Sequence, residues 1–159
     1  MRLIAAGVLA LLLCACCSQI SSTGLDTESL VIAQFPKQRE LGRYRLGVNK
    51  IFTLSFIHSV SKTRVTDVYE VQDGKIVQTK EFFKAHGAGL PSSPDEPGGL
   101  FWEKDKDQFI LHMKRPISKL VVQTDKIYQN RLALGSVIID LNQWEDQALL
   151  IYIDPKISN

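Results

Sequence analysis

The chain of 159 residues has no cysteine after position 17, and its three cysteines, Cys14, Cys16 and Cys17, stand together near the N-terminus. A disulfide framework distributes its cysteines through the fold, so this pattern excludes one for the rest of the chain. The sequence also lacks an excess of charge of one sign, since its formal net charge is +2. This balance gives no sign of nucleic acid as a partner, because such proteins carry a pronounced basic field.

The sequence also lacks the motifs that accompany catalysis, nucleotide binding or metal binding. It contains no Gly-x-Ser-x-Gly, no Gly-Lys-Ser/Thr and no His-Glu-x-x-His. Its three histidines, His58, His86 and His112, stand on three separate segments. We therefore predict no metal site and no cofactor, and we expect a protein that is not an enzyme.

One enzymatic alternative stays open. An unrecognised hydrolase would use His58 as its base, together with Asp67 or Glu81 as the orienting acid. Both carboxylates belong to the arms of an expected hairpin, where charged side chains usually face solvent. The sequence alone does not separate an acid from a base among them.

No apolar run is long enough for a comfortable membrane span, which takes about 20 residues. The run LIAAGVLALLLCACC covers only residues 3–17 and follows Arg2, a pattern typical of a secretory signal. The stretch Leu13-Cys14-Ala15-Cys16 resembles a bacterial lipoprotein signal. The resemblance implies that Cys16 becomes the lipid-modified first residue of the mature protein, anchored to a membrane in the periplasm. An uncut signal anchor and a soluble export signal are the alternatives, and all three place the domain outside the cytoplasm.

The chain divides into three parts by composition. Residues 1–15 are the lipoprotein-like signal peptide, and residues 16–28 form a polar tether rich in serine and threonine. Residues 29–159 have the length of a single domain. We expect this third part to be one β-domain.

Within that domain the hydrophobic period is mostly two, which is typical of strands rather than helices. Asp73-Gly74 stands between two alternating runs and predicts a tight hairpin. The strand-like segments are 51–60, 64–71, 75–83, 108–114, 118–124, 131–141 and 148–154. The sum of seven or eight short strands predicts an all-β fold, a single antiparallel β-sandwich or a small barrel.

The stretch HGAGLPSSPDEPGG, residues 86–99, holds four of the ten glycines and three of the six prolines. We divide it into an ordered part, residues 86–91, and a mobile tip, residues 92–99, since a loop of this length is uncommon in a compact domain. The alternative is a plain surface loop. Gly87 and Gly89 would expose backbone amides next to His86.

By strand alternation His58 continues the inward stripe of Phe52, Leu54 and Phe56, whereas Ser59 points to the other face. One interpretation of His58 is a buried neutral imidazole that hydrogen-bonds the backbone. The other is a ligand-binding groove. Its candidate residues are His58, Ser59, His86, Gly87 and Gly89.

Two motifs carry a family resemblance, and they stand on either side of the hairpin. The residues concerned are His58, Ser59, Val60, Thr63, Val65 and Tyr69, followed by Gly87, Ala88, Gly89, Leu90 and Pro91. They resemble the exported bacterial domain-of-unknown-function family 1850, over most of residues 45–153. The family has no assigned activity, but its members are often encoded beside tripartite ATP-independent periplasmic (TRAP) transporters, especially those with a TAXI-type solute receptor.

The resemblance therefore implies a membrane-tethered extracytoplasmic accessory or binding protein. Its partners would be the membrane, through the N-terminal lipid, and components of a TRAP transporter or their solute. A purely structural envelope lipoprotein and the hydrolase described above are the alternatives.

Overall fold

The computed structural model describes residues 28–84, residue 90 and residues 95–155. Most of this part is strand, and it also contains two short 3-10 helices in the C-terminal third of the chain. The strands are β1 (Ser29–Gln34), β2 (Arg39–Arg45), β3 (Ile51–Ile57), β4 (Arg64–Gln72), β5 (Lys75–Phe83), β6 (Gly99–Asp105), β7 (Gln108–Ile117), β8 (Leu120–Gln123), β9 (Arg131–Leu134), β10 (Val137–Asp140) and β11 (Ala148–Asp154). The helices are η1 (Lys126–Tyr128) and η2 (Leu141–Gln143).

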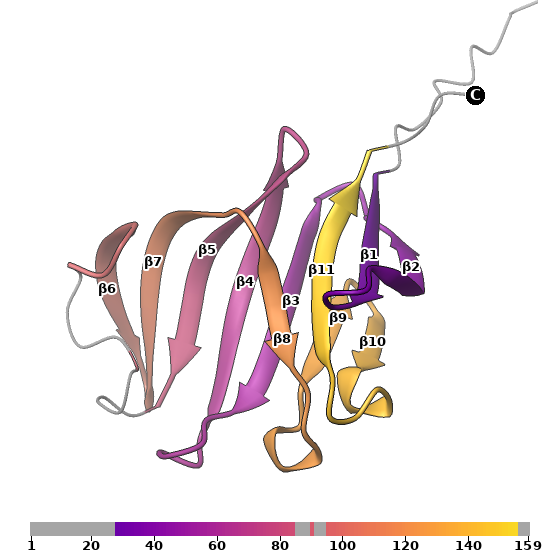
Figure 1. Ribbon diagram of the computed structural model, residues 1–159. Coiled ribbons are helices and arrows are strands. Elements are labelled where there is room, and N and C mark those ends of the chain that lie inside the picture. The colour runs from indigo at the N-terminus through magenta and orange to yellow at the C-terminus, as the bar shows by residue number, and fades with distance from the viewer. Residues whose placement is uncertain (1–27, 85–89, 91–94, 156–159) are drawn as a thin grey trace, which may run out of the picture.

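The strands form two antiparallel sheets that pack face to face (Figure 1). A four-stranded sheet has the order β2-β1-β11-β8, and a seven-stranded sheet has the order β10-β9-β3-β4-β5-β7-β6. The sheets are not closed into a barrel, so the all-β prediction is confirmed in its sandwich form. Strands β7 and β8 are consecutive in the chain but lie in different sheets, so the chain crosses between the layers there.

The described residues form eleven strands, which is more than the seven or eight expected from the sequence, for local physical reasons. The pattern of β1 shows no alternation, because its four central residues are all buried. Strands β2 and β6 lie at sheet edges and are mostly exposed, so they carry little hydrophobic signal. The run 131–141 breaks into β9 and β10 at a turn where Gly135 has a φ of 56°.

The hairpin predicted at Asp73-Gly74 is present. Both residues have positive φ, 50° and 72°, which is the geometry of a type I′ turn. The turn sets the register of β4 against β5, with Gln72 opposite Lys75. This register decides which side chains of β4 and β5 share a face.

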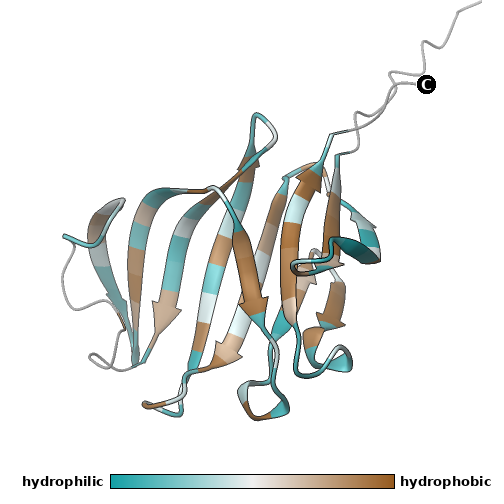
Figure 2. Ribbon diagram, in the orientation of Figure 1, coloured by the Kyte–Doolittle hydropathy of each residue, from teal (hydrophilic) through white to brown (hydrophobic). Residues whose placement is uncertain are grey.

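The main hydrophobic core lies between the two sheets and includes Phe52 stacked on Tyr69, with ring centroids 5.0 Å apart. Figure 2 shows hydrophobic residues along β8 and β11, whereas polar residues recur along β5. A second, smaller cluster occupies the far half of the large sheet. It consists of Val65, Phe83, Leu90, Leu111 and Met113, with Phe56, Trp102 and Phe109 packed against it.

The two sheets differ in width beside β8. The small sheet ends at β8, whereas the large sheet continues through β5 and β7 to β6. The inner faces of these outer strands therefore extend beyond the last strand of the small sheet (Figure 1). Within the described ranges, no helix has the length and apolar character needed to cross a membrane.

Candidate functional site

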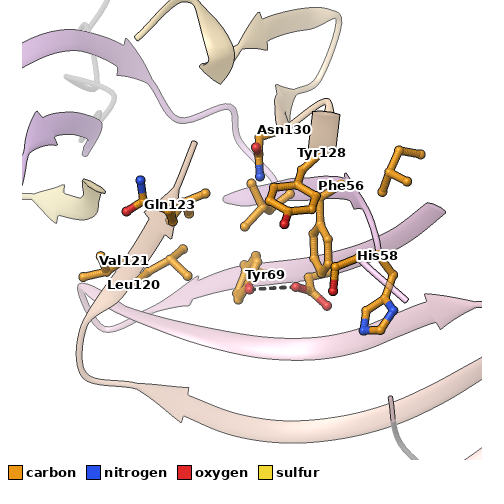
Figure 3. A pocket seen from close by; sticks show the side chains of 13 residues that line it. Phe56, His58, Tyr69, Leu120, Val121, Gln123, Tyr128 and Asn130 are labelled. Carbon is orange, nitrogen blue, oxygen red and sulfur yellow. Dashed lines mark hydrogen bonds between the residues drawn. The ribbon is translucent and has the colours of Figure 1, made fainter. Parts of the chain in front are cut away.

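A pocket opens beside β8, between the two sheets, with a volume of about 440 Å³. Its walls come from the end of β3, the middle of β4, the whole of β8 and the segment around η1 (Figure 3). The lining residues are Leu54, Phe56, Ile57, His58, Ser59, Asp67, Tyr69, Leu120, Val121, Val122, Gln123, Tyr128 and Asn130. Most of the lining is apolar, and a few polar groups converge on one side, as in most ligand sites.

Two of the polar groups point into the pocket from η1 and the segment that follows it. In Figure 3 the phenol of Tyr128 and the amide nitrogen of Asn130 are directed toward the space above Tyr69. Asn130 is only 5% exposed, and its amide nitrogen donates no hydrogen bond to any described residue. This amide nitrogen is a hydrogen-bond donor that a ligand in the pocket can reach.

Asp67 forms the polar floor of the pocket. Its carboxylate accepts hydrogen bonds from Tyr69 Oη at 3.2 Å and from Gln78 Nε2 at 2.9 Å (Figure 3). Burial raises the pKa of Asp67 to about 6, although both hydrogen bonds favour the ionised form. Burial and the nearby carboxylate also raise the pKa of Tyr69, so its hydroxyl stays a donor.

Glu81 lies directly opposite Asp67 across the β4–β5 ladder, on the same inner face. Its side chain is buried, and no side-chain hydrogen bond from a described residue reaches its carboxylate. Burial, together with the charge of Asp67, raises the pKa of Glu81 to about 7. Two buried carboxyls therefore share one site, which is the arrangement that disfavours double ionisation.

Arg115 on β7 supplies the cation that offsets this pair and lowers the pKa of both carboxyls. Its Nη1 donates to Gln78 Oε1 at 3.4 Å, and its Nε donates to the backbone oxygen of Pro97 at 2.6 Å. The cluster thus has two carboxyls and one guanidinium on three neighbouring strands. Of these three groups, Asp67 is the one that lines the pocket.

The comparisons with known proteins identify the family but not a function. The family model described as Domain of unknown function (DUF1850) matches residues 52–141, which is more than half of the chain. The chain belongs to the DUF1850 family. The family suspected from the sequence motifs is thereby confirmed, and the match spans every residue that lines the pocket. No curated protein and no solved structure is significantly similar to the chain.

Two of the predicted site residues, His58 and Ser59, line this pocket of the DUF1850 domain. His58 follows the last residue of β3 and is partly buried, and Ser59 is exposed. His86, Gly87 and Gly89 lie outside the described residues, as does Cys16, so their predicted roles remain predictions. Leu90, which follows the glycines, is buried in the second core cluster.

The ring of His58 caps a turn. Its Nδ1 accepts hydrogen bonds from the backbone amides of Val60 at 3.3 Å and Ser61 at 3.2 Å. These bonds fix the tautomer, because Nδ1 must then be unprotonated and Nε2 carries the hydrogen. In the described part of the chain, no hydrogen bond joins His58 to Asp67 or Glu81, so these residues are not arranged as a base with its orienting acid.

The other histidine that the structure describes, His112, does not line the pocket. It lies on the outer face of β7, where its ring stacks on Phe101 with centroids 4.2 Å apart and its Nε2 lies 2.8 Å from Glu103. Among the residues that the structure describes, no group of three or more potential ligands could hold a metal ion.

The expectation that the hairpin charges face solvent is wrong for two of them. Asp67 and Glu81 are each only 9% exposed. The sequence did indicate the burial of Asp67, because Asp67 lies an even number of positions from Val65, Tyr69 and Val71. Strand alternation places all of these residues on the inner face. Glu81 follows from the hairpin register, whereas Tyr128 and Asn130 have no periodic pattern that marks them.

Replacing His58 with alanine is expected to lower the free energy of unfolding by about 1 kcal/mol, because two backbone amides lose their acceptor. His58→Asn should retain most of the stability, since an asparagine side chain can accept from the backbone two residues ahead. Urea denaturation of both variants measures the difference. Equal losses for alanine and asparagine would contradict a turn-capping role.

Proposed function

We propose that this DUF1850 protein is a membrane-tethered, extracytoplasmic binding protein that assists a TRAP-type solute transporter. The observation that carries the proposal is the pocket beside β8, whose walls are apolar and whose floor holds a few convergent polar groups. Such a pocket suits recognition of a ligand. The lipoprotein-like signal supports tethering to a membrane outside the cytoplasm. The frequent location of family genes beside TRAP transporter genes supports the transporter role.

The site favours binding over hydrolysis. A nucleophile needs a base within hydrogen-bond distance, and that base needs an orienting acid. The Nδ1 of His58 instead accepts hydrogen bonds from two backbone amides. Tyr128 and Asn130 offer hydrogen-bonding groups to a ligand.

The proposal is tested by purifying the tagged full-length protein from detergent-solubilised membranes of its host. We expect subunits of a TRAP transporter, or its solute receptor, to be recovered with it and identified by mass spectrometry. Solute uptake should fall in a deletion strain and return with the intact gene. The Cys16→Ser variant, which lacks the lipid attachment residue, should restore less uptake.

A pair of neighbouring variants tests the pocket itself. Tyr128→Ser removes a ring from the pocket wall, whereas Ile127→Ser changes an adjacent side chain that is 65% exposed and lies outside the lining. We expect only Tyr128→Ser to reduce uptake. Absence of every transporter component, together with unchanged uptake in the deletion strain, would favour the structural envelope lipoprotein instead.

A further inference from the structure

Strand β8 has one open edge. It pairs with β11 on one side, and on the other side it has no partner among the described strands. The backbone amide of Thr124, the residue after β8, donates to the carbonyl of Gln147 at 2.9 Å. In an antiparallel ladder every second residue forms such a hydrogen-bonded pair, so this bond shows which residues of β8 face β11. The amides and carbonyls of Leu120 and Val122 therefore face β11, and those of Val121 and Gln123 face the open edge.

This edge borders the pocket described above. All four residues of β8 line the pocket, together with Asp67 and Tyr69 of β4 beneath. Figure 1 shows β8 in front of β4, with β5, β7 and β6 continuing beyond it. A strand added to β8 would extend the small sheet into the pocket, with its own inward side chains directed toward Asp67.

The chemistry under this position selects the side chain that would enter. Asp67 and Glu81 lie opposite each other, and Arg115 is the cation that acts on both of them. A lysine or arginine from above would balance the charges, whereas an apolar side chain would leave a buried carboxylate uncompensated. Asn130 offers its amide nitrogen on the same side of the pocket.

We propose that the open edge of β8 binds an extended segment of another protein as a fifth strand of the small sheet, with a lysine or arginine directed at Asp67 and Glu81. Main-chain hydrogen bonds to Val121 and Gln123 would hold the segment, and the acidic floor would select its sequence. The proposal rests on the proposed function, because it names the kind of ligand that the same pocket takes. A second copy of this chain fits less well, since pairing β8 with itself would place Leu120 and Val122 over the carboxylates.

The test uses the full-length protein in detergent micelles and the synthetic peptide acetyl-TVTKTVT-amide, whose lysine and valines share one strand face. Nuclear magnetic resonance should show hydrogen-exchange protection appearing at the amides of Val121 and Gln123 when the peptide is added. The peptide with glutamate in place of lysine should bind about tenfold more weakly or worse. The lysine peptide with methylated backbone nitrogens on its pairing edge should lose binding, with the protein itself unchanged.

Protein variants provide the matching controls. Val121→Pro removes an outward amide that no described hydrogen bond uses, while Val121→Thr keeps it, and this side chain is 40% exposed. We expect loss of peptide binding only with proline. Asp67→Asn should weaken the lysine peptide and not the glutamate peptide.

Several results would overturn the proposal. These are no binding at millimolar peptide, equal binding of the lysine and glutamate peptides, or binding without protection at Val121 and Gln123. A concentration-dependent dimer that protects the same amides would identify a second copy as the occupant. If Val121→Pro keeps its association with the transporter, strand addition fails while the proposed function stands.

Discussion

Replacing Arg115 with methionine is expected to lower the free energy of unfolding by about 2 kcal/mol at pH 8 and by clearly less at pH 5. Arg115 lowers the pKa of both Asp67 and Glu81, whose values of about 6 and about 7 mean that both ionise by pH 8. Without the guanidinium, two buried carboxylates face each other with no cation. At pH 5 both carboxyls are largely protonated in the folded state, so the charge matters less.

The pH dependence separates the charge from the other contacts of Arg115. Loss of its bond to the Pro97 carbonyl should cost the same at both pH values. Lys114→Met is the matched control, because this neighbouring side chain is exposed on the other face of β7. Urea denaturation at pH 5 and pH 8 gives the two differences. An identical loss at both pH values would show that the bond to Pro97, rather than the charge, accounts for the effect.

The fold class was predictable because most strands of the sandwich alternate cleanly. In β4 the pattern of burial follows every second residue from Val65 to Val71, and Asp73-Gly74 fixes the turn that follows. Strand β1 escaped detection, because a central strand buried on both faces has no alternation. No local pattern distinguishes such a segment from a buried helix.

The pocket was only half predictable, for a different reason. His58 and Ser59 stand at the end of a recognisable strand, so their place near the mouth of the sandwich followed from the sequence. Tyr128 and Asn130 reach the pocket only because the chain crosses to the small sheet at β8 and returns through η1. Pairing between segments distant in sequence depends on tertiary structure that no local window contains.

The acidic pair gives the second large prediction. Glu81→Gln is expected to raise the free energy of unfolding by about 2 kcal/mol at pH 8 and to leave it nearly unchanged at pH 4. The pKa of Glu81 is about 7 in the folded protein, above its ordinary value of 4.5. Between these values the folded state binds more protons than the unfolded state, so wild-type stability falls as the pH rises. Glutamine has no such proton to lose.

The groups that face Glu81 set the controls for this experiment. They are Asp67 on β4, Arg115 on β7 and Glu96 in the turn before β6. Asp67→Asn should raise the free energy of unfolding by less than Glu81→Gln does, because the carboxylate of Asp67 accepts hydrogen bonds from Tyr69 and Gln78. Chemical denaturation across pH 4 to 8 gives the free energies of unfolding of the wild-type protein, Asp67→Asn and Glu81→Gln. A gain of equal size at pH 4 and pH 8 would contradict a cause in ionisation.

Glu81→Gln also separates stability from function at one position. If the carboxyl pair exists to receive a basic side chain, the variant should be more stable at pH 8 and yet bind the lysine peptide more weakly. Opposite signs of this kind arise where a protein keeps a destabilising group for binding. A carboxylate that is simply tolerated in the sheet would give the gain in stability with unchanged affinity. The two measurements on one variant therefore decide between a functional and a structural origin of the buried charge.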